Sequence, residues 1–150
     1  MHHELRTEIE IDAPVEAVWE TLTDLTAYPE WNTFIVSAEG RAAVGERLTN
    51  HLQPPRGRAM TFKPTVTVVE PTVAFEWLGR LGMPGIFDGR HRFDLAPSAN
   101  GGTRLMQSEQ FSGILVRFVR RSLDTQTIAG FEAMNAALKA RVEAAVGSPS

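Results

Sequence analysis

The sequence predicts a single α+β domain in which a seven-stranded antiparallel sheet wraps around one long C-terminal helix. The length of 150 residues is that of one ordinary domain, so a second domain is not expected. Between residues 33 and 112, strand-like segments alternate with short connectors rich in glycine, proline or asparagine, which is typical of antiparallel meanders. From residue 124 onward, apolar residues recur at helical spacing instead.

The first part of the chain predicts one strand followed by two short helices. Residues 5–11 alternate polar and apolar side chains, so we expect a half-buried strand there. Pro14 suits the first turn of a helix that Asp12 can cap, and residues 15–22 carry one apolar face. A second short helical turn is expected to end before Pro29, because a residue that precedes proline avoids the helical region.

The middle of the chain predicts six further strands. They lie at residues 34–39, 47–53, 60–70, 72–80, 86–96 and 104–112. Pro64 falls inside one of these strands and has no N–H to donate, so we expect an edge or a bulge there.

The last segment predicts a helix of about six turns, because the apolar spacing changes to steps of three and four. It is expected to begin near Asp124 and to end at Gly147 and Pro149. Three interpretations of Gly130 inside it stay open: it lets the helix approach the sheet, it leaves room for a ligand, or it is simply tolerated there. The stripe of the predicted helix that faces the sheet is formed by Ile128, Phe131, Asn135, Leu138 and Val142.

Composition excludes several classes of protein. The chain has no cysteine, so disulfide scaffolds, thiolate metal sites and cysteine catalysis are excluded. The net charge of −3 does not favour a nucleic-acid binder. No apolar run approaches the ~18 residues of a membrane-spanning helix, and the first residues lack the pattern of a signal peptide. A cytoplasmic location is therefore expected.

Two motifs resemble a known family. They are the helix entry Ala13-Pro14-Val15-Glu16-Ala17-Val18-Trp19, and Asp24 followed by Tyr28-Pro29-Glu30-Trp31-Asn32. Together with the element order they resemble the polyketide cyclase/dehydrase-type branch of the START and birch-pollen-allergen (SRPBCC) superfamily. The resemblance implies a helix-grip fold over residues 1–150, with an ordered core of about 4–146, and an internal cavity for a hydrophobic small molecule. It supplies no invariant set of catalytic residues.

Strand parity then indicates which side chains face that cavity. On residues 86–96 the apolar parity includes His91, and on residues 104–112 the more apolar parity includes Gln107 and Glu109. The apolar side chains predicted to bind the ligand are Trp31, Phe34, Phe62, Phe75, Trp77, Phe87, Phe93, Phe111 and Phe131. The polar ones are Asn50, His91, Gln107, Glu109 and Asn135. Trp31 has a second interpretation, as a core anchor of the second short helix.

His91 and Glu109 are the candidate catalytic residues. A histidine titrates near neutrality, and a neighbouring carboxylate orients it for proton transfer. The same pair can instead bind a ligand by hydrogen bonds or serve structure alone. One residue of register slip would send either side chain outside.

Three functions are consistent with the resemblance and the residues. The first is binding or transport of a small hydrophobic molecule, such as a lipid or a polyketide-like metabolite. The second is a cyclase or dehydratase that uses His91 and Glu109. The third is a protein-interaction module like the superfamily's co-chaperones. The expected partner is a small hydrophobic ligand, with no cofactor, metal, nucleic acid or stable membrane insertion, and with a monomer or a homodimer both open.

Overall fold

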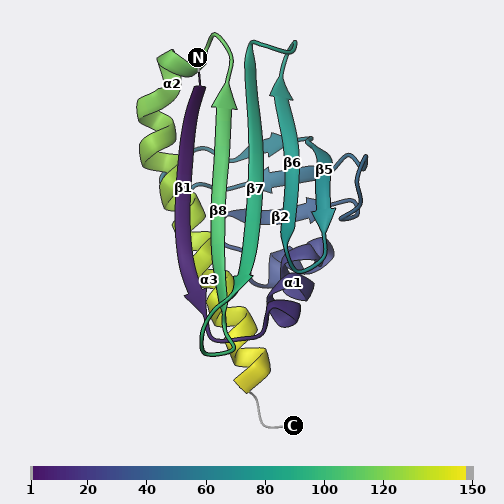
Figure 1. Cartoon of the computed structure of the whole chain (residues 1–150). Coiled ribbons are helices and arrows are strands. Elements are labelled where there is room, and N and C mark those ends of the chain that lie inside the picture. The colour runs from purple at the N-terminus through teal and green to yellow at the C-terminus, as the bar shows by residue number, and fades with distance from the viewer. Residues whose placement is uncertain (1, 148–150) are drawn as a thin grey trace.

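The structure is a computed structural model that describes residues 2–147 (Figure 1). Its strands are β1 (His2–Ile11), β2 (Ile35–Glu39), β3 (Thr49–Leu52), β4 (Met60–Phe62), β5 (Thr65–Glu70), β6 (Ala74–Leu81), β7 (Phe87–Pro97) and β8 (Thr103–Ser112). Its helical segments are α1 (Val15–Thr23), η1 (Leu25–Glu30), α2 (Val116–Ser122), η2 (Leu123–Thr127) and α3 (Ile128–Gly147). The α+β class and the element order are as predicted, with eight strands instead of seven.

The strands form two antiparallel sheets. Five strands lie in the order β1-β8-β7-β6-β5, and three in the order β2-β3-β4. An isolated bridge between Arg47 and Thr65 joins the sheets, and the Leu48 N–H donates to the Pro64 carbonyl at 2.8 Å. The eighth strand arises because the predicted strand at residues 60–70 breaks before Pro64, and its two halves join different sheets. The irregularity expected at Pro64 is thus a corner between sheets.

A bulge in β5 places Val68 on the opposite face of the sheet from the one expected. The pairing with β6 shifts between Val66 and Val68, so Val66 lies opposite Trp77 but Val68 lies opposite Glu76. Unbroken alternation along residues 60–70 predicts that Phe62, Val66 and Val68 share one face; for Val68 this prediction is wrong, because the extra residue of a bulge changes the parity of the residues after it. Val69 takes the inward position and packs against the core.

The C-terminal helix covers one face of the five-stranded sheet (Figure 1). It begins at Val116, eight residues before the predicted start at Asp124, and continues through a π-helical segment, η2, into α3. The prediction of the start is wrong because α2 carries three arginines and an exposed Phe118 where the apolar stripe would be. The end at Gly147 agrees with the prediction, while Pro149 lies outside the described residues.

The first helices close the end of the molecule farthest from the start of α2 (Figure 1). Asp12 does not cap α1, because Pro14 occupies the cap position and the Asp12 N–H donates to Glu143 instead. After η1, the Asn32 Oδ1 accepts from the N–H groups of Phe34 and Ile35 at 3.0 and 2.9 Å. This turn, which lies beside the buried Trp31, directs Phe34 into the interior.

Candidate functional site: an apolar cavity with a buried His–Glu pair

A cavity of about 340 Å³ lies between the sheets and the C-terminal helix. Eight of the fourteen predicted ligand-binding side chains line it: Phe34, Asn50, Phe62, Trp77, Phe87, His91, Glu109 and Phe111. They come from β3, β4, β6, β7 and β8 and from the turn before β2. The inward parity predicted for β7 and β8 is confirmed by the burial of these strands.

The other six predicted side chains do not line this cavity. Phe75, Phe93, Gln107, Phe131 and Asn135 are buried in the core behind its wall. Trp31 packs edge-on against Tyr28 and borders a separate hollow of about 200 Å³, beside Arg141. Parity shows which face of the sheet a side chain occupies, but the packing of α3 decides where along that face space remains.

The helical side of the wall was not predicted from the sequence. It is formed by Leu115, Val119, Ser122, Leu123, Gln126 and Thr127. The signal that could have found it is the step of four between Leu115, Val119 and Leu123, which places three apolar side chains on one helical face. Gly130, in α3, makes room for a wall residue, because a Cβ there would overlap the ring of Phe34.

His91 is held on β7 by aromatic rings. Its ring stacks on Trp77 with centroids 4.9 Å apart, and it lies 4.8 Å from the Phe93 ring and 4.9 Å from the Phe131 ring. These contacts leave the imidazole little rotational freedom. The orientation of its two nitrogens is therefore set by the fold before any ligand is bound.

A chain of hydrogen bonds determines which His91 nitrogen carries a proton. Thr7 Oγ1 donates to the Gln107 carbonyl oxygen and accepts from Asn135 Nδ2. Gln107 Nε2 donates to Asn135 Oδ1 at 2.7 Å and to the Phe131 carbonyl oxygen at 3.4 Å. Gln107 Oε1 therefore faces His91 Nε2 at 2.9 Å, and as an acceptor it requires a proton on that nitrogen.

The other nitrogen of His91 faces Glu109. The two residues lie directly opposite each other on β7 and β8, with His91 Nδ1 3.3 Å from Glu109 Oε1. Because Nε2 already carries a proton, this contact is a hydrogen bond only if a further proton lies between Nδ1 and the carboxylate. The pair then exists either as imidazolium with carboxylate or as imidazole with carboxylic acid.

Glu109 is the more exposed residue of the pair, and it lines the cavity. Its side chain is 16% exposed, against 6% for His91. Its Oε2 accepts no hydrogen bond from the residues that the structure describes, and it lies where a Cβ of Gly89 would be. The missing side chain of Gly89 thus makes room for the carboxylate beside the cavity.

This combination of an antiparallel sheet, a long C-terminal helix and a cavity between them defines a helix-grip protein. The chain belongs to the family described as polyketide cyclase / dehydrase and lipid transport, whose model matches residues 2–143. No curated protein matches the chain in sequence. The resemblance carried by the two sequence motifs is confirmed by this family match.

Solved structures share the fold at low sequence identity. The Zhui aromatase/cyclase from a Streptomyces species is similar with a TM-score of 0.80 and 15% identity, over 97% of this chain and 96% of that one. The protein TTHA0849 from Thermus thermophilus is similar with a TM-score of 0.75 and 20% identity, over 95% of this chain and 99% of that one. A point mutant of norcoclaurine synthase from Thalictrum is similar with a TM-score of 0.73 and 14% identity, over 95% of this chain and 94% of that one. At these identities the likeness shows the fold alone.

The helices and acidic groups of the described chain offer neither a membrane span nor a metal cluster. Among residues 2–147 there is no helix that is both long and apolar enough to cross a membrane. Over the same residues, no three histidine, aspartate or glutamate side chains are grouped in a way that could hold a metal ion.

Proposed function

We propose that the protein binds a small hydrophobic molecule, lipid-like or polyketide-like, in the 340 Å³ cavity. The observation that carries this proposal is the wall: aromatic and aliphatic side chains make up most of it, with fewer polar groups contributed by several elements. Ligand sites typically combine many apolar walls with a few polar groups that fix orientation. The family description, which includes lipid transport, supports the same function.

The His91–Glu109 pair favours a second candidate, a cyclase or dehydratase. Both nitrogens of His91 have a partner, whereas Glu109 Oε2 accepts no hydrogen bond within residues 2–147 and lies at the cavity. In this mechanism the carboxyl group of Glu109 exchanges a proton with the substrate, and His91 orients it and supplies or accepts the balancing proton. In a dehydration, one proton leaves a carbon of the substrate and one joins the departing hydroxyl to form water.

Mass spectrometry of the purified protein tests the first candidate. We expect a stoichiometric apolar molecule in the native spectrum that is released on denaturation, or, in the emptied protein, saturable binding of an environment-sensitive apolar dye. If the protein is empty and also binds no dye, both cavity functions are contradicted. A protein-interaction module is then the favoured function.

Two matched variants locate the binding. Gly79→Leu places a side chain into the cavity from β6, where a Cβ would meet only ordinary contacts, so it should lower dye binding. Thr61→Leu introduces the same side chain at an exposed position that does not line the cavity and should leave dye binding unchanged. Equal effects of the two variants would place the dye outside the cavity.

His91→Ala separates carrier from enzyme. If the protein is a carrier, the variant retains most of its ligand binding, because the wall is mainly apolar. If the protein is an enzyme, the variant loses turnover of the precursor of the co-purified molecule while binding persists. Unchanged turnover in the variant would exclude the His91–Glu109 mechanism.

A further inference from the structure

Exposed apolar side chains gather at one end of the molecule, where two segments meet. The loop between β6 and β7 lies at the same end as the start of α2 (Figure 1). Backbone hydrogen bonds join them, from the Ile114 N–H to the Gly85 carbonyl and from the Leu115 N–H to the Ile86 carbonyl, both at 3.1 Å. The two segments therefore form one continuous surface.

Four apolar side chains of this surface are more than half exposed, and these four are here called the apolar tip. They are Leu81 at 56%, Met83 at 73%, Ile114 at 64% and Phe118 at 69%. Single exposed apolar side chains are ordinary, but a group of large ones on adjoining segments marks an interaction site.

Unpaired positive charge lies beside the apolar tip. Arg117, Arg120 and Arg121 on α2 have no carboxylate partner among the described residues, and α2 contains no acidic residue. The guanidinium of Arg117 lies over the Phe118 ring, 4.8 Å from its centroid. Of the acidic side chains on the adjoining elements, Asp88 pairs with Arg80, and Asp124 Oδ1 lies 2.6 Å from His3 Nε2, so the three arginines outnumber the one carboxylate that lacks a permanently charged partner. The surface is thus complementary to an anionic partner.

The cavity wall extends to the same surface. Leu81, Leu115 and Val119 belong to the cavity wall and are also partly exposed, at 56%, 37% and 36%. A body that covered the apolar tip would therefore also contact residues of the cavity wall.

We propose that this end of the molecule docks reversibly on an anionic lipid bilayer. The apolar tip enters the headgroup region, and the three arginines contact lipid phosphates, which is how basic amphipathic surfaces bind membranes. A second copy of the chain fits less well, since a symmetric contact would bring the arginines of both copies together. Docking goes beyond the proposed function and holds whether or not the cavity carries a ligand.

Co-sedimentation with vesicles tests the docking. We expect binding to vesicles that contain phosphatidylglycerol, little binding to pure phosphatidylcholine, and weakening by salt. The double change Arg120→Glu and Arg121→Glu should weaken binding by about tenfold or more, because it replaces two charges that attract the anionic surface with two that are repelled by it. Phe118→Ser should also weaken it, whereas Val44→Ser, at a residue that is 65% exposed outside the apolar tip, should not.

A tryptophan probe tests the orientation. Phe118→Trp should show a blue-shifted emission on anionic vesicles and quenching by brominated lipid, and Val44→Trp should show neither. No binding to anionic vesicles, or binding that all these variants leave unchanged, overturns the proposal; capture of an acidic protein without vesicle binding also overturns it. Dye uptake in solution by Phe118→Ser should match the wild type, because Phe118 does not line the cavity. Loss of docking is thereby distinguished from loss of the cavity function.

Discussion

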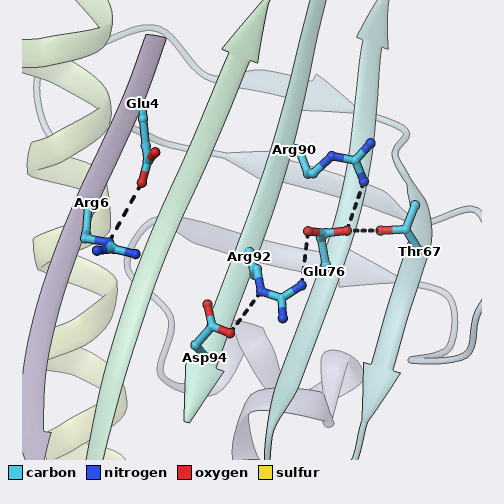
Figure 2. Close-up of polar contacts among 7 residues, drawn as sticks. All are labelled: Glu4, Arg6, Thr67, Glu76, Arg90, Arg92 and Asp94. Carbon is cyan, nitrogen blue, oxygen red and sulfur yellow. Dashed lines mark hydrogen bonds and ion pairs between the residues drawn. The ribbon is translucent and has the colours of Figure 1, made fainter. Parts of the chain in front are cut away.

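Each face of the central strands carries a carboxylate, and the two carboxylates differ in how many hydrogen-bond partners they have. On the outer face, Glu76 of β6 lies among charged residues of β7 (Figure 2). On the inner face, Glu109 of β8 lies beside His91 of β7 at the edge of the cavity. Because side chains alternate along a strand, β7 serves both faces at once.

The outer carboxylate is fully satisfied. Glu76 accepts from Thr67 Oγ1 at 2.7 Å, from Arg90 at 3.0 Å and from Arg92 at 3.4 Å, as Figure 2 shows. Burial by itself raises the pKa of Glu76, but the hydrogen bonds from Thr67, Arg90 and Arg92 and the charge of Arg90 outweigh it, and the pKa lies below its usual value. Such a group stabilises the fold and has no free atom for a ligand.

The inner carboxylate is only half satisfied. Among the described residues, Glu109 has one hydrogen-bonding contact, at 3.3 Å, and its second oxygen lies beside the cavity. A partly satisfied polar group beside a cavity contributes little to stability and remains available to a bound molecule. The comparison indicates that the number of partners, more than burial, separates a carboxylate that only stabilises the fold from one that remains available to a bound molecule.

The strongest contrast is expected between the two carboxylates themselves. Glu76→Gln should lower the free energy of unfolding by about 2 kcal/mol, because it removes charge-assisted hydrogen bonds to two arginines. Glu109→Gln should change it by less than about 1 kcal/mol. Urea denaturation of both variants measures the difference, and equal losses would remove the distinction between the two faces.

A second, more moderate effect concerns the space that Gly89 leaves for Glu109. Gly89→Ala should displace the carboxylate, cost about 1 kcal/mol through overcrowding, and alter ligand or dye binding. Gly79, directly opposite on β6, is the matched control, because a Cβ there meets only ordinary contacts beyond 3.4 Å. If Gly79→Ala perturbs binding as much as Gly89→Ala, the position of Glu109 does not matter.

A lesser effect is the pH dependence that Glu76 confers. Its pKa in the folded protein is lowered from the ordinary 4.5, so its stabilisation is fully present above pH 4.5 and is lost as the pH falls through the lower folded value. Over that acidic range, the unfolding free energy of the wild type should fall more steeply than that of Glu76→Gln. Parallel curves from denaturation at a series of pH values would contradict the assignment.

The weakest effect is expected at an exposed ion pair on the same outer face. Glu4 Oε1 lies 3.8 Å from Arg6 Nε, with both side chains about half exposed (Figure 2). Glu4→Gln should change the unfolding free energy by less than about 0.5 kcal/mol, because water screens such pairs. A loss as large as that of Glu76→Gln would show that burial of Glu76 adds nothing.

Local periodicity explains what could be predicted. The alternation in β7 and β8 predicted that His91, Gln107 and Glu109 point inward, because the period of two is a property of the strand itself. The same reasoning failed for Val68, since a bulge is set by the pairing of two strands. It also failed for α2, whose exposed apolar and basic residues do not give the pattern of a packed helix.

The order of residues along the chain was enough to predict the α+β class, the sequence of elements, the family and the inward face of the strands that carry the His–Glu pair. Packing in three dimensions was needed to place His91 directly opposite Glu109 and to let Gln107 and Asn135 orient the imidazole from behind the wall. Packing also placed six of the predicted side chains away from the cavity. It placed residues of α2 and η2 in the cavity wall instead. The reason is physical: facing follows from the backbone period of one segment, whereas register, depth and empty volume depend on how distant segments pack together.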